Sequence, residues 1–217
     1  MVAQMVYARV AADLWSSLSL VAQGVLTSTL FAATAVLVAD RSRLLRFVAA
    51  PPVLVLRYTP IAALVPVMIL LLGVGRPLGV AVIFLGCAPS MALQFCDIRR
   101  CEPTIYYRFL RHAGLSRPKA YWYGCFLGSL PRYVRSLRVF AGWAWSYVIL
   151  AELIGVGQGL GYAIQDARRW GDIRTALWLV VLVAAVGFLV DVAFAVVIRV
   201  GFAWERSYAG RHAYHQV

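Results

Sequence analysis

The stretch LWLVVLVAAVGFLVDVAFAVVI, residues 177–198, carries one charged side chain, that of Asp191. A helix that crosses a membrane needs about 20 apolar residues, because the hydrocarbon is about 30 Å thick and each residue rises about 1.5 Å. A strand of a membrane barrel would instead alternate apolar and polar residues. The continuous apolar run therefore predicts a transmembrane helix over residues 177–198.

The composition of the whole chain agrees with a membrane protein. Of its 217 residues, 62% are hydrophobic and 14% are charged, whereas soluble domains average about 45–50% and about 25%. A chain of this size has too little interior to hide so much apolar surface from water. The composition thus argues against a cytosolic enzyme, a disordered tail and a secreted disulfide-rich domain.

Further apolar stretches predict an all-α integral membrane protein with five transmembrane helices in a single domain, residues 1–217. The predicted spans cover residues 14–39, 53–74, 78–96, 134–154 and 177–198. The second is unusual because residues 61–74 are too few to cross alone. The preceding VLVLRYT, which lies between prolines, is expected to complete that crossing as a broken helix.

Arg and Lys are distributed unevenly between the two predicted sides of the membrane. Fifteen lie in the loop after the first span, in residues 97–138 and in the C-terminal tail, and five lie on the opposite side. Basic loops stay in the cytoplasm, so we expect the N-terminus outside and the C-terminus inside, in a bacterial inner membrane. The sequence has no aromatic-basic RNA motif or zinc finger, and no nucleic-acid partner is expected.

The sequence offers no arrangement of residues for catalysis or metal binding. No pair of cysteines has zinc or haem spacing, and no nucleophile elbow, phosphate loop or paired carboxylate occurs. The histidines are His112, His212 and His215, and the last two lie in the basic tail. We therefore expect no enzyme activity, no metal site and no cofactor in this chain, so that any ATP would be hydrolysed by another protein.

Residues 97–131 are too many for a connector between helices, which typically has about 2–8 residues. They predict two short helices on the cytoplasmic side. The first begins at Glu102-Pro103, an acidic residue followed by proline at the first helical position, and ends at Gly114, which tolerates a left-handed conformation. One face of this helix carries Ile105, Phe109 and His112.

The second short helix is expected to begin after Ser116 as its N-cap, with Pro118 in its first turn, and to end at Leu130-Pro131. Two amphipathic helices joined at a glycine could place an apolar face in the groove of a partner protein. They could equally lie among the lipid headgroups, anchored by Arg and Tyr. The residues alone leave both interpretations open.

Three ionisable residues lie at predicted membrane depth, where charges are costly and often functional. Glu152, near the outer end of the fourth span, either lines a pathway or caps amides of the outer loop around residues 155–161. Asp191 either serves function or contacts backbone or another helix. Arg57 either holds an anion or extends to lipid phosphates.

Trp143 and Tyr147 lie four residues apart in the fourth span and therefore share a helix face. Aromatic side chains at such positions pack between helices more often than they line a cavity. Gly142 would allow another helix to approach closely there. The pair thus marks either a helix contact or one wall of a pathway.

Several short motifs along the chain, taken together with their order, resemble those of the permease subunits of ABC importers. GLS at 114–116 followed by LP at 130–131 resembles their cytoplasmic coupling loop. AELIG at 151–155, GLGY at 159–162 and DAR at 166–168 are similar to the branch that imports sulfonates, taurine, nitrate or bicarbonate. Upstream, the resemblance extends to Pro60, LVP at 64–66, LGVG at 72–75 and FLG at 84–86, so it covers roughly residues 14–206.

The resemblance implies a MetI-like permease core with a cytoplasmic coupling-helix pair that transports a small organic or inorganic anion. It implies a second permease copy or homologue, two cytoplasmic ATPase subunits that bind ATP and Mg²⁺, and an external solute-binding protein. Coupling to the ATPase would involve Glu102, Ile105, Arg108, Phe109, Arg111, His112, Gly114, Leu115 and Ser116. The translocation pathway would involve Arg57, Tyr58, Trp143, Tyr147 and Glu152.

Two departures from the family pattern bear on function. Members usually have Glu-Ala-Ala six residues ahead of the glycine, whereas this chain has Arg108-Phe109-Leu110, which reverses a charge. The usual first of six spans also has no counterpart. Either the ATPase groove has changed to match, or the chain is the degenerate half of a heterodimer and serves as a non-transporting scaffold.

Overall fold

The computed structural model describes residues 2–41, 43–100 and 104–202, and every regular element in these ranges is helical. The α-helices are α1 (Val2–Arg41), α2 (Arg43–Tyr58), α3 (Ile61–Leu72), α4 (Arg76–Arg100), α5 (Thr104–His112), α6 (Arg117–Tyr121), α7 (Gly128–Ala151), α8 (Leu160–Arg169) and α9 (Ile173–Gly201). Two π-helical turns, η1 (Trp122–Leu127) and η2 (Glu152–Val156), continue α6 and α7. The predicted all-α fold class is confirmed.

Within the residues that the structure describes, four helical stretches are long and apolar enough to cross a membrane. They are Arg9–Ala39, Arg76–Arg99, Arg117–Val156 and Ile173–Gly201. A fifth candidate is the pair Pro51–Tyr58 and Ile61–Leu72, which is bent by 104° at a short break. The break falls at Thr59, since a residue that precedes proline disfavours the helical conformation. Counting this pair as one crossing gives five spans, and its broken form agrees with the prediction.

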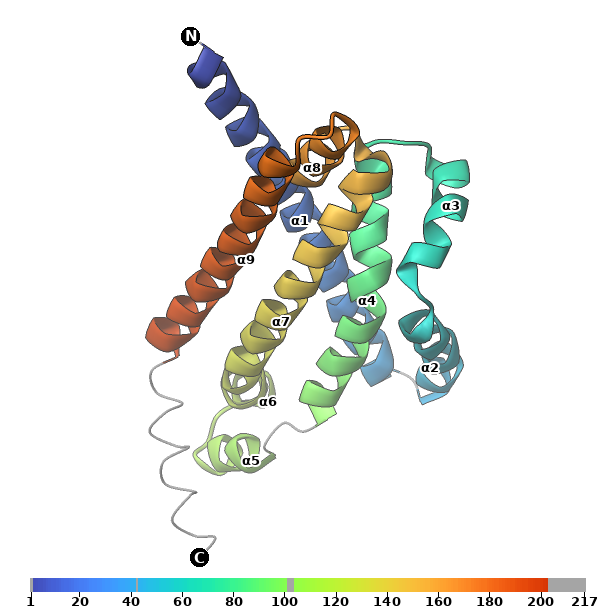
Figure 1. Cartoon of the computed structure of the whole chain (residues 1–217). Helices are drawn as coiled ribbons and strands as arrows, with labels where there is room; N and C mark the ends of the chain where they lie inside the picture. The colour runs from blue at the N-terminus through green and yellow to red at the C-terminus, as the bar shows by residue number, and fades with distance from the viewer. Residues whose placement is uncertain (1, 42, 101–103, 203–217) are drawn as a thin grey trace, which may run out of the picture.

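Helix α4 lies at the centre of the structure, with α1 and α7 packed along it (Figure 1). Its fully buried side chains include Ile83 and Met91. Glycines bring the helices close at two points, because a Cβ at Gly24 would overlap Ile83 and a Cβ at Gly86 would lie 2.5 Å from the ring of Tyr147. Helices α1, α4 and α7 therefore form the core of the bundle and hold the elements at its two ends in place.

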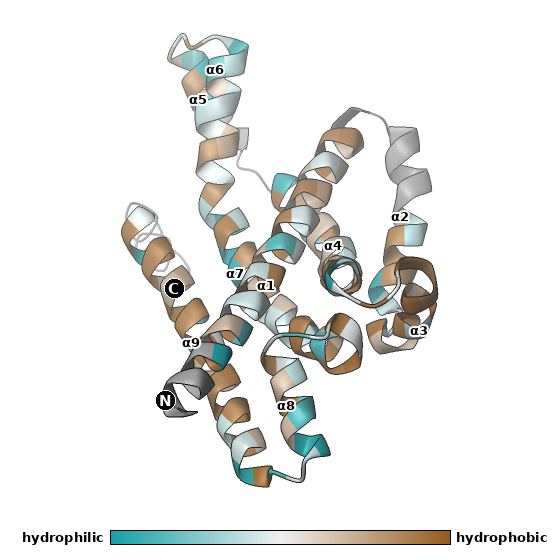
Figure 2. Ribbon diagram, turned by 90° about the horizontal axis from the view of Figure 1, so that it is seen from above, coloured by the Kyte–Doolittle hydropathy of each residue, from teal (hydrophilic) through white to brown (hydrophobic). Residues whose placement is uncertain are grey.

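Helix α9 contacts α7 and α8, and hydrophobic residues make up most of its length (Figure 2). Leu179 is buried, whereas Trp178 and Phe188 are 74% and 67% exposed. Asp172 caps the helix by accepting hydrogen bonds from the backbone N and Oγ1 of Thr175 (3.0 and 2.6 Å), and these bonds hold the pKa of Asp172 below its usual value. A helix with so apolar a surface suits a lipid environment.

The two ends of the bundle differ in the elements that they carry (Figure 1). One end carries α5, α6 and the C-terminal ends of α1, α4 and α9, and the other end carries α8 and the turn between α3 and α4. The basic residues expected in a loop after the first span, Arg41, Arg43 and Arg46, lie instead at the end of α1 and the start of α2. These residues and the basic residues 97–138 were predicted to share one side of the membrane. The structure places these two regions at the same end.

The predicted helix end at Leu130-Pro131 is wrong. Helix α6, η1 and α7 follow one another without interruption, so the span predicted for residues 134–154 lies within a longer helical stretch, Arg117–Val156. Pro131 is buried near the start of α7. The wider turn η1 directly before it already interrupts the regular hydrogen-bond ladder, so that the missing N–H of proline does not break the helix.

Candidate functional site

Helices α5 and α6 meet at a sharp turn, and together (residues 104–121) they form the elbow. Helix α5 ends with two backbone hydrogen bonds, from Leu115 N to Leu110 O (3.1 Å) and from Gly114 N to Arg111 O (3.2 Å), the pattern of a Schellman motif. Gly114 has φ +88°, a conformation that glycine adopts without steric cost. The predicted stop at Gly114 is confirmed, and backbone bonds fix the turn.

The elbow exposes an aromatic side chain among basic ones. Phe109 is 69% exposed, and Arg108 and His112 on the same helix are also exposed. Arg111 is exposed and donates a hydrogen bond from Nη1 to the carbonyl of Leu115 (2.8 Å). Since residues 103–151 include no Asp or Glu, this end of the chain has a strong excess of positive charge.

The remaining predicted coupling residues have different outcomes. Ser116 occupies the N-cap position of α6 with an extended backbone, but its side chain makes no capping hydrogen bond, so that detail of the prediction is wrong. Pro118 removes one of the two N–H groups that such a side chain could bind, and the other, that of Lys119, is not used. Glu102 lies outside the described residues. The structure places the backbone of Ile105 in α5 and does not describe its side chain.

Aromatic contacts join the elbow to the spans. The guanidinium of Arg99, near the end of α4, lies 4.6 Å from the ring centre of Tyr121, a cation–π geometry. In η1 the rings of Trp122 and Phe126 stack with their centres 4.7 Å apart. The elbow is therefore attached both to α4 and to the helical stretch that continues as α7.

At the opposite end of the molecule, Glu152 is almost fully buried, with 1% of its surface exposed. Its Oε1 accepts a hydrogen bond from Ser17 Oγ (2.7 Å), and its Oε2 accepts one from the backbone N of Gly161 (2.8 Å). Burying a carboxylate is costly unless hydrogen bonds satisfy its oxygens. The prediction that Glu152 caps amides of the outer loop is confirmed.

The first two N–H groups of α8, and that of the N-cap residue Gly159 before it, are capped by side chains from other elements. Gly161 N donates to Glu152, Leu160 N donates to Ser17 Oγ (3.0 Å), and Gly159 N donates to Asp13 Oδ1 (3.1 Å). These groups join α8 to α1 and to η2, and we call them the outer cap after the side of the membrane that was predicted for them. Helix N-termini favour such acceptors because their N–H groups have no partner within the helix.

Glycine is required at two positions of the outer cap. Gly159 has φ +105°, and a Cβ there would overlap the carboxylate of Glu152. At Gly161 a Cβ would lie 2.7 Å from the carbonyl oxygen of Ile149. The GLGY motif, residues 159–162, thus owes its glycines to the close approach of Glu152 and of the Ile149 carbonyl.

Arg76, at the start of α4, contacts α1 close to the outer cap. Its Nη2 donates to Ser19 Oγ at 2.8 Å, and the longer contact from Nη1 reaches Ser16 Oγ at 3.4 Å. The backbone N of Gly75 donates to the carbonyl of Gly155 (2.9 Å). The ends of α1, α4, η2 and α8 are therefore held together by polar contacts that the sequence analysis did not foresee.

The predicted pathway residues lie on different elements. Arg57 and Tyr58 are exposed at the end of α2, with the guanidinium 5.9 Å from the ring centre. Trp143 on α7 is 44% exposed and meets Phe140 edge to face, whereas Tyr147 is half-buried against Gly86. Tyr147 therefore makes the helix contact that was one of the two expectations for this pair.

Asp191 pairs with Arg138 across α7 and α9. Its Oδ1 accepts from Nε (2.6 Å) and its Oδ2 from Nη2 (2.5 Å), the two-pronged geometry that guanidinium favours. The expected contact of Asp191 with another helix is confirmed. The partner was missed, because Arg138 was counted among the basic residues of the predicted cytoplasmic segment 97–138.

Within the described ranges, no three His, Cys, Asp or Glu side chains lie close enough together to hold a metal ion. The described cysteines Cys87, Cys96 and Cys125 are unbridged. The geometry thus offers two regions of interest at opposite ends, the elbow and the outer cap, joined by the long helix that contains α7.

Known transport proteins are similar to this chain. A family described as "binding-protein-dependent transport system inner membrane component" matches residues 24–200. The chain is 25% identical over 184 residues to the taurine transport system permease protein TauC of Escherichia coli (strain K12), covering 83% of this chain and 67% of that protein.

Two further relatives are named after other solutes. The putative aliphatic sulfonates transport permease protein SsuC of Bacillus subtilis (strain 168) is 28% identical over 166 residues, covering 74% of this chain and 58% of the relative. The bicarbonate transport system permease protein CmpB of Synechococcus elongatus (strain ATCC 33912 / PCC 7942 / FACHB-805) is 25% identical over 177 residues, with 81% and 64% covered. The chain thus spans 58% to 67% of the length of these three relatives.

Solved structures share the fold. The MetNI methionine ABC transporter in an inward-facing conformation matches with a TM-score of 0.71 at 18% identity, covering 91% of this chain and 97% of that one. An amino acid ABC transporter matches with a TM-score of 0.67 at 14% identity, covering 92% and 95%. The MetI-like core predicted from the sequence is confirmed.

The family match extends over most of the chain and confirms the predicted resemblance. In an ABC importer the permease forms the membrane component and has no cofactor, while ATP is bound and hydrolysed by a separate subunit, as the sequence analysis expected. This chain belongs to the binding-protein-dependent transport system inner membrane components, the multi-pass permease subunits of ABC importers.

Proposed function

We propose that this chain and a second permease, either a copy or a homologue, form the pathway by which a small organic or inorganic anion enters the cytoplasm. Two ATPase subunits would bind the elbows, and a solute-binding protein would deliver the anion at the opposite end. The names of the relatives support an anionic solute, since taurine, aliphatic sulfonates and bicarbonate all carry an acidic group.

The observation that carries this proposal is the elbow. Phe109 projects from α5 at 69% exposure, although exposing a large aromatic ring to water is unfavourable. Aromatic residues and Arg are typical of the hot spots that contribute most of the binding energy in a protein interface. We infer that α5 lies in a groove of the ATPase, with Arg108, Phe109, Arg111 and His112 as contacts and Gly114-Leu115-Ser116 as the turn that sets its direction.

A continuous helical stretch connects the elbow to the outer cap. Arg117–Val156 begins in the elbow and ends at Glu152 and η2. Motion imposed on α5 would therefore be carried along this helix as a nearly rigid body, and the outer cap would pass it to α1 and α8. Such shifts of packed helices are a common form of coupled conformational change.

The proposed orientation places the elbow in the cytoplasm and the outer cap outside. The basic excess around the junction of α1 and α2 and in residues 97–138 supports it, because basic loops remain on the cytoplasmic side. This puts the N-terminus outside and the C-terminus in the cytoplasm.

For the pathway we propose the exposed side chains among the predicted residues, namely Arg57, Tyr58 and Trp143. Arg57 could attract an anion through its positive charge, and Trp143 could supply an apolar wall. Tyr147 and Glu152 would support this surface without contacting the solute. Tyr147 packs against Gly86, and Glu152 is enclosed in the outer cap.

Affinity purification of the full-length chain from a cell that expresses its neighbouring genes tests the proposal. We expect an ATPase to co-purify in stoichiometric amount, and the reconstituted complex to take up a labelled small anion when ATP is supplied. A complex that is stable without an ATPase, or one that hydrolyses ATP with no uptake of any small anion, would contradict it.

The alternative function, a non-transporting scaffold, is favoured by Arg108, whose charge is opposite to that of the usual family residue. We propose instead that the ATPase groove is acidic at this point, since no carboxylate lies in residues 103–151 to balance the elbow. Arg108→Glu should then weaken binding of the ATPase about tenfold or more, because a like-charge contact replaces an attractive one. Binding measured in detergent at two salt concentrations checks this, and unchanged or tighter binding would favour the scaffold.

A further inference from the structure

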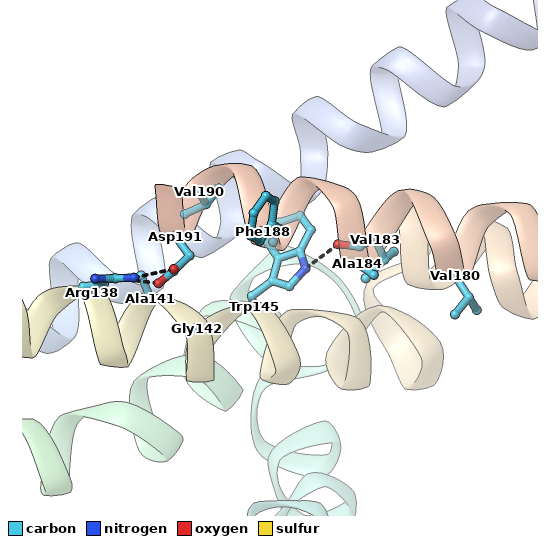
Figure 3. Close-up of a pocket in the computed structure, with 11 residues that line it drawn as sticks. Arg138, Ala141, Gly142, Trp145, Val180, Val183, Ala184, Phe188, Val190 and Asp191 are labelled. Atoms are coloured by element: carbon cyan, nitrogen blue, oxygen red, sulfur yellow. Dashed lines mark hydrogen bonds and ion pairs between the residues drawn. The ribbon is translucent and has the colours of Figure 1, made fainter. Parts of the chain in front are cut away.

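A cavity of about 380 Å³ opens between α7 and α9 (Figure 3). Small and apolar residues form most of its wall, among them Ala141, Gly142, Val183, Ala184 and Gly187. Gly142 faces open space, because a Cβ at that position would meet no side chain and no neighbouring helix within 4 Å. Such a wall suits a hydrocarbon chain, which gains free energy by leaving water for an apolar surface.

Trp145 joins the two helices beside the cavity. Its Nε1 donates a hydrogen bond to the carbonyl of Val183 (3.0 Å) (Figure 3). Glycine at position 187 permits this approach, because a Cβ there would lie 2.9 Å from the indole ring. The distance between α7 and α9 along the cavity is therefore set by contacts within this chain.

The cavity opens onto the apolar face of α9. Val180 and Phe188 line the cavity and are exposed, and Val181 and Leu189, the residues that follow them, are exposed as well. Apolar side chains along the outside of a membrane-spanning helix meet lipid tails, which are as apolar as they are. Lipid is therefore the ligand that lies nearest to the cavity.

The ion pair of Arg138 and Asp191 closes the end of the cavity that points toward the elbow (Figure 3). Asp191 lies 18 residues after Ile173, where α9 begins, and Arg138 lies 18 residues before Val156, where η2 ends. Both are thus about 27 Å along their helices, or about 25 Å deep at the average tilt of about 20°. Since the hydrocarbon is about 30 Å thick, the long side chain of Arg138 can reach the headgroups on the side of the elbow.

The ion pair keeps binding capacity on both partners. Asp191 is bound by Nε and Nη2 of Arg138, so the two N–H groups of Nη1 take no part in the pair, and each carboxylate oxygen retains a further lone pair. The side chains of Arg138 and Asp191 are 38% and 48% exposed. A lipid headgroup at this level thus meets hydrogen-bond donors and acceptors at the same opening.

We propose that this cavity binds a phospholipid of the leaflet on the side of the elbow, with a headgroup that joins a phosphate to a primary ammonium group, as in phosphatidylethanolamine. The phosphate accepts hydrogen bonds from Nη1 of Arg138, and the ammonium group donates to Asp191. An acyl chain lies along the apolar wall, against Gly142 and Ala184. The inference rests on the proposed function only for the orientation, which makes this leaflet the cytoplasmic one.

The charge balance of the pair carries the choice of headgroup. Arg138 and Asp191 together have no net charge, so an anionic headgroup would bring a second negative group to Asp191 without compensation. A headgroup with both a phosphate and an ammonium group is itself neutral, and each of its ends meets an opposite charge. A choline headgroup is also neutral, but its ammonium group has no N–H to donate to the carboxylate.

Titration of synthetic lipids onto the purified permease–ATPase complex in detergent, followed by native mass spectrometry, tests the headgroup. The probes are phosphatidylethanolamine, phosphatidylcholine and phosphatidylglycerol with identical acyl chains. We expect the ethanolamine lipid to bind about tenfold or more tightly than the other two, because a site built for an N–H donor rejects analogues that lack it. Asp191→Asn should reverse this preference toward the glycerol lipid, since Arg138 then has no counter-charge. Asp166→Asn, which removes an exposed carboxylate on α8, is the matched control and should change nothing.

A second variant tests the cavity and leaves the ion pair in place. Gly142→Leu fills the space for the acyl chain and should weaken binding of the ethanolamine lipid by about tenfold, while leucine favours the helix more than glycine does. Gly128→Leu is the matched control, because Gly128 also lies on α7 with nothing within 4 Å of a Cβ and does not line the cavity. Its lipid affinity should equal that of the native chain.

Three results would overturn the inference. They are equal affinities for the three lipids in the native complex, unchanged binding in Gly142→Leu, and a disulfide between two chains that carry Gly142→Cys, which would show that a second permease covers the cavity. Each leaves the proposed function intact if uptake continues. Failure to bind an ATPase would instead remove the proposed function, and the lipid affinities would then be measured on the permease alone with the same expected order.

Discussion

Replacing Phe109 by alanine is expected to reduce the affinity of the permease for its ATPase by about 2 kcal/mol or more, roughly 30-fold. An aromatic ring that is buried on binding contributes most of its energy through the water-accessible surface that it removes. At 69% exposure in the isolated chain, Phe109 has most of that surface available. ATP-driven uptake should fall in parallel, because an ATPase that does not stay bound cannot move the spans.

The isolated permease should remain folded in this variant. Alanine favours a helix more than phenylalanine does, and the bonds that end α5 involve backbone atoms of Leu110, Arg111, Gly114 and Leu115. Titration of the ATPase onto the permease in lipid nanodiscs, together with thermal unfolding of the permease alone, separates the two effects.

Trp170 provides the matched control, since it is 81% exposed and lies directly after α8 at the opposite end of the molecule. Trp170→Ala should leave ATPase affinity unchanged. If Phe109→Ala binds the ATPase as tightly as the native chain, and binds anionic vesicles more weakly, then the elbow is a lipid anchor and the proposed docking is wrong.

The elements that depend on local sequence could be predicted. Long apolar runs give the spans, because the thickness of the hydrocarbon alone sets their length. The stop at Gly114 follows from a residue that can adopt φ +88°. The bend before α3 follows from Pro60, which affects the conformation of its neighbour.

Contacts between distant residues could not be predicted. Glu152 was expected to cap loop amides, yet its second partner, Ser17, lies 135 residues earlier in the chain. Arg138 and Asp191 are 53 residues apart, and the sequence gives no sign of which faces of α7 and α9 meet. Such pairs depend on helix packing, which small residues such as Gly187 allow but do not specify.

The error at Pro131 has a different origin. Proline usually ends or bends a helix, and that rule takes no account of a π-helical turn. Here η1 precedes the proline and widens the helix at that point. Such turns often mark functional positions, and this one lies where the elbow joins α7.

Gly159→Ala is expected to destabilise the chain by about 3–5 kcal/mol, the usual cost of leaving a buried charge without its partners. The new Cβ would overlap the carboxylate of Glu152, which would have to give up its hydrogen bonds to Ser17 and Gly161. Gly157 is the matched control, because it also has positive φ (+78°) but a Cβ at that position would meet no other atom within 4 Å. Gly157→Ala should cost only the backbone strain, about 1–2 kcal/mol.

A double-mutant cycle isolates the contact with Glu152. In a Glu152→Ala background the carboxylate is absent, so Gly159→Ala should cost only the backbone strain at its φ of +105° and ψ of 177°, and the difference between the two backgrounds measures the steric and electrostatic coupling. Chemical denaturation of the detergent-solubilised chain, followed by tryptophan fluorescence, gives each free energy. Equal costs of Gly159→Ala in both backgrounds would show that Glu152 does not hold the outer cap together, and α1 and α8 would then be held at this end by the hydrogen bonds of Asp13 and Ser17 and by apolar packing.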